Sequence, residues 1–294
     1  MIPLGNAVGI KLFADGALVV SVSDGDCHLK TGDLLLRINS EKIRSTEFLQ
    51  SYLQDNAAAP VSLTLRRDSR MCTLTVTPKA DTQGVYHIGA WVRDSMAGIG
   101  TMTYYDPATG TFGALGHGIN DVDTAMLMSL SSGSIMETTV KAVKRGCAGD
   151  PGELKGDFTI QRDMGTLRAN TAGGVFGTLG DTSLLTNNQH PIPVASADEI
   201  TTGPATILST VSGNTPREYA VEILRLNSGN DTRNMVLRIT DPALLSATGG
   251  IVQGMSGSPI LQNGRIVGAV THVLVNDPTQ GYGIFMENML SMAN

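Results

Sequence analysis

The sequence predicts a mostly β protein with two domains. Its 294 residues suit two domains, because a domain usually runs to about 100–200 residues. Glycine is abundant, at 34 residues, whereas aromatic residues make up only 4% of the chain. Many short apolar runs separated by glycines are typical of strands joined by tight turns, and a hydrophobic content of 41% is enough for real cores.

The first 80 residues are expected to form one α+β unit. Its strands are expected where short runs are apolar and β-prone, at residues 8–13, 17–22, 34–38, 61–66 and 71–77. Turns are expected at Ala14-Asp15-Gly16 and at Arg67-Asp68-Ser69. Residues 45–54 begin with a Ser/Thr cap and place Phe48, Leu49 and Leu53 on one face, which predicts a helix.

This order of elements resembles a PDZ domain. The best match is residues 29–39, whose Leu-Lys-Thr-Gly-Asp start is similar to the turn before a core strand in PDZ domains of bacterial proteases. The resemblance implies a groove between the second strand and the helix, where an extended peptide adds as another strand. By position, the loop and strand of that groove are expected to be Leu4, Gly5, Asn6, Ala7 and Val8.

From residue 81 to 294 a second domain is expected, after a short polar linker at residues 78–84. It repeats short apolar runs between Gly, Asp and Asn, and its candidate strands are residues 100–105, 111–115, 133–139, 158–161, 174–179, 204–211, 219–226, 235–240, 260–261, 265–273 and 282–286. Helical periodicity is predicted only near the end, at residues 287–292. So many strands over one domain predict a β-barrel or a pair of barrels.

A serine between glycines is the strongest chemical signal. In Gly254-Met255-Ser256-Gly257-Ser258-Pro259, the glycines permit a tight turn that exposes the Ser256 hydroxyl and nearby N–H groups. The segment resembles the Gly-x-Ser-Gly-Gly-Pro nucleophile loop of chymotrypsin-like peptidases, with Ser258 in place of the second glycine. That resemblance implies Ser256 as the nucleophile, with the N–H groups of Gly254 and Ser256 as the oxyanion donors.

The expected general base is His117, in Leu115-Gly116-His117-Gly118. A histidine between glycines after an apolar strand has the access that proton exchange needs. The other histidines fit less well: His28, His87, His190 and His272, of which the last is expected to line the cleft.

A carboxylate should orient the imidazole, and spacing alone does not choose among several aspartates. The candidates are Asp121, Asp123, Asp157, Asp181, Asp198, Asp241 and Asp277. Asp241 follows an apolar run and lies near the nucleophile in sequence, whereas Asp121 could reach His117 locally.

Taken as a whole, the chain resembles the SpoIVB sporulation serine peptidases. The similarity rests on long segments at residues 98–118, 149–156 and 253–278, and it extends over residues 1–294. It implies a PDZ domain followed by a chymotrypsin-like β-barrel peptidase domain, with His117, Asp241 and Ser256 as the triad.

The resemblance also implies a biological role. Such peptidases are exported to the space between the two forespore membranes, where they cleave themselves and a regulatory protein in the signalling that activates pro-sigma-K. The implied partners are a protein or peptide substrate and the chain's own N-terminal region. Family members normally carry an N-terminal membrane segment, so membrane association is expected only through a segment absent from these 294 residues.

Composition argues against several other classes of protein and of functional site. The net charge is −6 and neither domain has a basic stripe, which argues against nucleic acid as a partner. Cys27, Cys72 and Cys147 form no Cys-x-x-Cys pair, so neither a zinc site nor a disulfide framework is expected. No metal or organic cofactor is expected, because a serine nucleophile needs none.

Two alternatives remain open at this point. One is a PDZ peptide-binding scaffold whose peptidase-like domain is inactive. The other is a different serine hydrolase such as an esterase, which the absence of a Gly-x-Ser-x-Gly elbow makes the weaker alternative.

Overall fold

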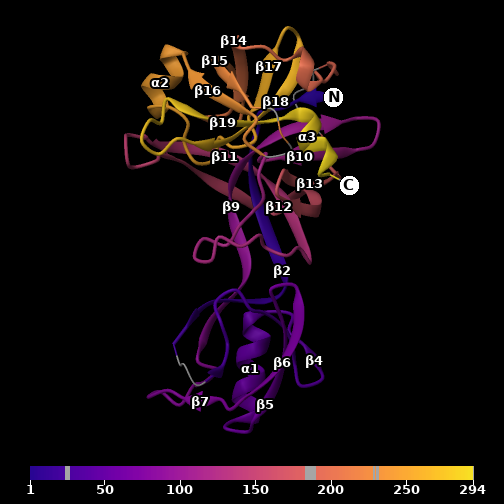
Figure 1. Cartoon of the computed structure of the whole chain (residues 1–294), viewed down its shortest axis with the longest axis vertical. Helices are drawn as coiled ribbons and strands as arrows, with labels where there is room; N and C mark the ends of the chain where they lie inside the picture. Colours follow the sequence, from indigo (N-terminus) through magenta and orange to yellow (C-terminus); the bar gives the residue numbers. More distant parts are fainter. Residues whose placement is uncertain (24–26, 183–189, 228, 230–231, 294) are drawn as a thin grey trace. The chain divides into compact units, whose positions relative to one another are not determined.

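The structure is a computed structural model that describes residues 1–23, 27–182, 190–227, 229 and 232–293. It divides into two compact units, drawn in Figure 1 with their elements labelled. The barrel unit holds Met1–Lys11, Ala97–Ile119 and Gly133–Asn294, and the α+β unit holds Leu12–Met96 and Asn120–Ser132.

The α+β unit contains the predicted helix, strands at the predicted positions and three short strands that the sequence does not predict. They are β3 (Leu34–Ile38), β4 (Glu41–Lys42), α1 (Thr46–Asn56), β5 (Val61–Arg67), β6 (Arg70–Val76), β7 (Lys79–Ala80) and β8 (Tyr86–His87), with parts of β2 (Ala7–Val22) and β9 (Ala90–Asp106). Helix α1 begins as predicted, because the Ser45 side chain accepts a hydrogen bond from the Phe48 N–H. Its buried face, Leu49 and Leu53, packs into the core of this unit.

The Gly-Asp turn before β3 has a clear structural cause. Asp33 is only 1% exposed, and its carboxylate accepts hydrogen bonds from Arg67 Nε at 2.7 Å and from the Lys30 N–H at 2.8 Å. The hydrogen bond with Asp33 raises the pKa of Arg67. Asp33 therefore fastens the turn to the end of β5, which explains why an aspartate stands at this position.

The barrel unit contains two sets of paired strands. In the first, the order is β1 (Ile2–Pro3), β9, β10 (Thr111–Ala114), β13 (Gly174–Leu179), β12 (Glu153–Thr171), β11 (Ser132–Lys144) and β2. Because β2 also pairs with β9, the strands from β9 round to β2 form a closed cycle of pairings.

The second set is a closed barrel. Its order is β14 (Gly203–Ser209), β15 (Arg217–Leu226), β16 (Met235–Ile239), β19 (Gln280–Phe285), β18 (Arg265–Val273) and β17 (Pro259–Gln262). Two short helices accompany it, α2 (Pro242–Thr248) and α3 (Met286–Ser291), together with a 3₁₀ turn at Ala197–Glu199 (Figure 1). The chain is thus mostly β, with an α+β unit and a chymotrypsin-like barrel unit, as the sequence predicts.

Several local predictions differ from the structure. Residues 7–22 form one continuous strand, β2, in place of two strands with a turn at Ala14-Asp15-Gly16. Gly16 is there because a Cβ would lie 2.4 Å from the Leu35 carbonyl oxygen, and not because the chain reverses. Strand β12 is longer than expected, and helix α2 was not expected at all.

The division at residue 80 does not match the two units. Residues 1–11 belong to the barrel unit, where the Leu4 N–H donates to Thr103 O at 3.1 Å and the Thr210 hydroxyl donates to Gly5 O at 2.9 Å. Residues 81–96 belong to the α+β unit, in which Ile88 is 3% exposed within the core. The limits of the two units therefore follow burial and backbone pairing, and not the polar segment at residues 78–84 where the boundary was expected.

Among the described residues, no helix has both the length and the apolar character that crossing a bilayer requires.

Candidate active site

Ser256 lies in the turn that leads into β17, in the barrel unit. Its side chain is partly exposed, whereas Ser258 is fully buried. The Ser258 hydroxyl donates to Met255 O at 2.8 Å and lies 3.0 Å from the Ser209 hydroxyl. Ser258 is therefore a structural part of the loop, which leaves Ser256 as the accessible hydroxyl.

The carbonyl groups of this loop are all engaged. The Leu154 N–H donates to Gln253 O at 2.8 Å, and the Thr101 hydroxyl donates to Gly254 O at 2.8 Å. The Ser258 N–H donates to Met255 O at 3.0 Å, and the Thr101 N–H donates to Ser256 O at 2.9 Å. The orientation of each peptide group from Gln253 to Ser256 is thus fixed by a hydrogen bond.

The N–H groups of the same loop behave differently. The N–H groups of Gln253, Met255, Gly257 and Ser258 donate to protein carbonyls. Among the described residues, those of Gly254 and Ser256 have no acceptor. These are the two N–H groups that the nucleophile-loop resemblance implies as oxyanion donors, and a rigid loop that leaves two donors unused can receive an external oxygen.

Two glycines make this loop possible. Gly254 has φ +98° and Gly257 has φ +95°, in the left-handed region that glycine tolerates. A Cβ on Gly257 would lie 2.0 Å from Thr101 O and 2.5 Å from the Leu115 N–H nitrogen. The glycine at 257 therefore also lets the serine loop approach the segment that precedes His117.

His117 follows a sharp turn at the end of β10. Leu115 and Gly116 both have positive φ, at +70° and +68°, and the Leu115 N–H donates to Thr101 O at 3.1 Å. Thr101 thus bonds to both the histidine segment and the serine loop, which brings the two predicted segments together in the barrel unit.

The imidazole of His117 has a defined hydrogen bond. Its Nδ1 lies 2.8 Å from the Gly118 carbonyl oxygen, and because a carbonyl only accepts, Nδ1 carries the proton in the neutral ring. Nε2 is then the basic nitrogen. Burial lowers the pKa of His117, and the Gly118 carbonyl opposes that shift. A neutral imidazole whose Nε2 can accept a proton is the form that a general base needs.

His272, on β18, is the close ring neighbour of His117. The ring centroids are 4.9 Å apart and the planes are tilted by 36°. Burial, and then His117 and Arg233, lower the pKa of His272 to about 4, so its ring is neutral at ordinary pH. His272 therefore adds no positive charge beside the candidate base.

Asp241 has a different set of partners from those of a triad aspartate. It is the N-cap of α2, and its Oδ1 accepts hydrogen bonds from the N–H groups of Ala243 and Leu244, both at 2.9 Å. Its Oδ2 lies 3.4 Å from the Ala220 N–H nitrogen. Within the part of the chain that the structure describes, no hydrogen bond joins Asp241 to His117. The triad role of Asp241 stays a prediction.

Other candidate carboxylates also have local partners. Asp121 is 1% exposed, forms an ion pair with Arg93 and accepts hydrogen bonds from Thr124. Asp277 binds Thr279 and Gln280 in its own turn. In the described residues, His117 Nδ1 is thus held by a backbone carbonyl and not by a carboxylate.

The five residues predicted for the peptide groove lie elsewhere. Leu4, Gly5, Asn6, Ala7 and Val8 are all buried in the barrel unit. Gly5 has no room for a side chain, since a Cβ would lie 2.7 Å from Leu208. The prediction was wrong because these residues pair with β9 and pack inside the barrel unit, so they are not available to a peptide.

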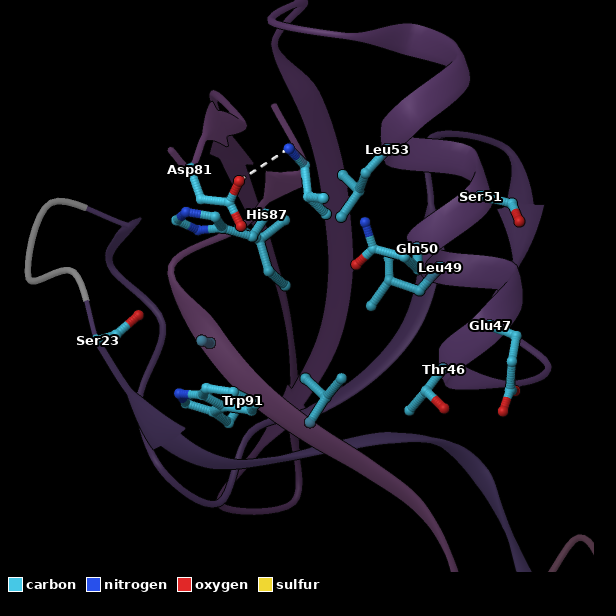
Figure 2. A pocket seen from close by; sticks show the side chains of 14 residues that line it. Ser23, Thr46, Glu47, Leu49, Gln50, Ser51, Leu53, Asp81, His87 and Trp91 are labelled. Carbon is cyan, nitrogen blue, oxygen red and sulfur yellow. Dashed lines mark hydrogen bonds between the residues drawn. The ribbon is translucent and has the colours of Figure 1, made fainter. Parts of the chain in front are cut away.

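The α+β unit has a groove of its own, shown in Figure 2. A pocket of about 750 Å³ lies between α1, which contributes Leu49, Gln50 and Leu53, and the segment with His87 and Trp91. Trp91 is 70% exposed at its edge. The sequence signal for this second wall is an apolar-glycine-apolar triplet, residues 88–90, followed by the only tryptophan of the chain.

The closed barrel, and a partly exposed serine on a loop with two unused N–H donors, define a serine peptidase with a chymotrypsin-like fold. The family model "SpoIVB peptidase S55" matches residues 84–290. The chain therefore belongs to the SpoIVB peptidase S55 family.

Solved structures give more distant similarities. The active form of the Rv3671c protease from Mycobacterium tuberculosis is 16% identical with a TM-score of 0.38, over 67% of this chain and 73% of that one. The HtrA-type protease AlgW with a decapeptide is 13% identical with a TM-score of 0.36, over 67% and 51%. The PDZ domain of an SdrC-like protein from Listeria monocytogenes is 23% identical with a TM-score of 0.26, over 26% and 87%. Among curated proteins, none matches the chain.

Proposed function

We propose that the chain is a serine endopeptidase in which Ser256 is the nucleophile and His117 is the general base. The observation that carries the proposal is the pair of unused N–H groups, Gly254 and Ser256, on a loop whose carbonyls are all bonded. Such preorganised donors stabilise the oxyanion of a tetrahedral intermediate, and losing one typically slows the reaction by about 10²–10³.

The reaction runs through an acyl-enzyme. His117 Nε2 takes the hydroxyl proton as Ser256 Oγ attacks the substrate carbonyl carbon. The carbonyl oxygen then accepts hydrogen bonds from the N–H groups of Gly254 and Ser256. The imidazolium gives its proton to the leaving amine, and water then hydrolyses the ester with His117 as base again. The Gly118 carbonyl holds Nδ1–H throughout, which keeps Nε2 directed to the chemistry.

The groove of the α+β unit is the proposed holding site for an extended peptide. Leu49 and Leu53 supply an apolar floor and Gln50 supplies a polar side chain beside it. The segment held there is proposed to come from a protein substrate or from the chain's own N-terminal region. Binding in the groove would raise the local concentration of peptide near the enzyme.

Family membership also supports a proposal for the cellular role. We infer that the peptidase cleaves itself and a regulatory protein in the sporulation signalling that leads to pro-sigma-K activation, after export to the space between the forespore membranes. What supports this is the SpoIVB family match over residues 84–290. Anchoring through a membrane segment outside these residues belongs to the same proposal.

The direct test compares purified wild-type protein with Ser256→Ala. Both are incubated and followed by intact mass, and both are treated with a fluorophosphonate that labels activated serines. We expect fragments and a single phosphonyl adduct in the wild type alone. Labelling without fragments would fit an enzyme that needs a separate substrate. No labelling in the folded wild type would refute the catalytic assignment and favour a peptide-binding scaffold with an inactive peptidase domain.

A further inference from the structure

Thr101 occupies an unusual position among the buried polar residues of the barrel unit. It lies on β9, is 0% exposed and uses all three of its polar groups. Its hydroxyl donates to Gly254 O at 2.8 Å, its N–H donates to Ser256 O at 2.9 Å, and its carbonyl accepts from the Leu115 N–H at 3.1 Å.

These bonds fall on both sides of one peptide group. The Gly254 carbonyl belongs to the peptide before Met255, and the Ser256 carbonyl belongs to the peptide after Ser256. Between them lies the peptide that carries the Ser256 N–H. Ser258 bonds to the carbonyl of this peptide, Met255 O, and Thr101 holds the peptides on both sides of it. Because a planar peptide rotates only as a unit, these bonds together fix the direction of the Ser256 N–H.

We infer that Thr101 is a positioning residue that holds the Ser256 N–H in the orientation needed to bind the oxyanion. The inference rests on the proposed function, since it assigns a supporting residue to the same oxyanion site. Thr101 touches neither substrate nor reacting atoms and acts through the 254–256 backbone. Its carbonyl also anchors the segment before His117, so a single buried residue sets the spacing of base and donor loop.

The hydroxyl is the part of Thr101 that can be tested alone. Thr101→Val keeps the shape and the backbone bonds but removes the donor to Gly254 O, so that, among the described residues, the 254–255 peptide keeps only the bond from the Met255 N–H to Val252 O. Thr101→Ser keeps the donor. The losses seen when oxyanion donors are removed are about 10²–10³, so for an indirect effect we expect labelling to slow by about 10–100-fold in Thr101→Val.

The chain supplies a matched control two residues away. Thr103 lies on the same strand and is also 0% exposed, but among the described residues its hydroxyl has no hydrogen-bond partner. Thr103→Val therefore makes the same chemical change in the same strand without removing a bond to the serine loop. We expect it to label at the wild-type rate.

The experiment measures the second-order rate constant of fluorophosphonate labelling, as a function of pH, for the full chain and these variants. The expected result is slow labelling in Thr101→Val, with the pH midpoint unchanged because His117 keeps its surroundings, and recovery to within about threefold in Thr101→Ser. A purely structural role would lower the melting temperature and the fraction of protein labelled, but not the rate constant of the folded fraction.

Two results would overturn the inference. One is labelling of folded Thr101→Val within twofold of Thr103→Val, and another is Thr101→Ser as slow as Thr101→Val. If Thr101→Val does not fold, Thr101→Cys, with its weaker donor of similar size, takes its place under the same criteria. Wild-type protein that never labels refutes the proposed function itself, which separates that failure from a failure of the role of Thr101.

Discussion

The role of Asp241 can be decided by a substitution that removes the carboxylate but keeps an N-cap residue at the start of α2. Oδ1 of Asp241 accepts hydrogen bonds from the N–H groups of Ala243 and Leu244 at the start of α2. Serine is an equally good N-cap but cannot serve as the acid of a triad. Asp241→Ser and Asp241→Ala therefore separate the two roles.

The structure predicts a stability effect and little effect on chemistry. Loss of an N-cap typically costs about 1 kcal/mol, so Asp241→Ala should lower the melting temperature by about 2–4 °C for a chain of this size class. Asp241→Ser should regain most of that loss. Because a carbonyl, and not Asp241, binds His117 Nδ1, both variants should label with a fluorophosphonate within about threefold of the wild type.

The assay is thermal unfolding followed by circular dichroism, together with the labelling rate on the same samples. A triad aspartate typically contributes about 10⁴ in rate. A fall of that order in Asp241→Ser, with normal melting, would refute the reasoning from the hydrogen bonds. It would then support the triad that the SpoIVB resemblance implies.

Three further predictions concern the two units separately. Burial lowers the pKa of His117 below 6.5, and the imidazole acts as a base only when it is neutral. The labelling rate should therefore rise with pH through a midpoint below 6.5, and a midpoint at or above 6.5 would contradict this prediction. Gly257→Ala puts a Cβ 2.0 Å from Thr101 O and should lower the free energy of unfolding by more than about 2 kcal/mol, as measured by urea unfolding. Gly264→Ala, which has open space but positive φ, should lower it by about 1 kcal/mol, and equal effects of the two variants would count against the close approach. Trp91 is the only tryptophan, so its emission should shift when a peptide binds the groove, and an unchanged spectrum at saturation would place the peptide elsewhere.

The serine and histidine loops were predictable because their signals are local. Gly116, Gly254 and Gly257 have positive φ and close neighbours, and glycine in such positions is visible in the sequence. Asn263 and Gly264, between β17 and β18, also have positive φ, and Asn-Gly is the local sequence signal for such a hairpin turn.

The features that could not be predicted from the sequence depend on pairing between residues far apart in the chain. Leu4–Val8 look like the start of a PDZ domain by order along the chain, but their partners are Met102, Thr103 and Thr210, about 100 and 200 residues away. The position of Thr101 beneath the serine loop was hidden likewise, because a buried threonine in a strand has no local signature. Helix α2 is only seven residues long, too short for a periodic pattern to stand out.

The interleaving of the two units bears on how the chain folds. Residues 1–11 belong to the barrel unit, which is complete only when residues 97–119 and 133–294 have also been synthesised. The α+β unit is complete only when residues 120–132 have been synthesised. On a ribosome, the first strand therefore emerges long before its partners do, and its apolar residues have no stable place to pack meanwhile. Neither unit can be cut out as one continuous fragment. A chain break after residue 96 or 119 divides both units, whereas a break after residue 11 or 132 leaves the α+β unit whole in one piece. Each of the four breaks divides the barrel unit, so the peptidase barrel depends on chain continuity through the α+β unit.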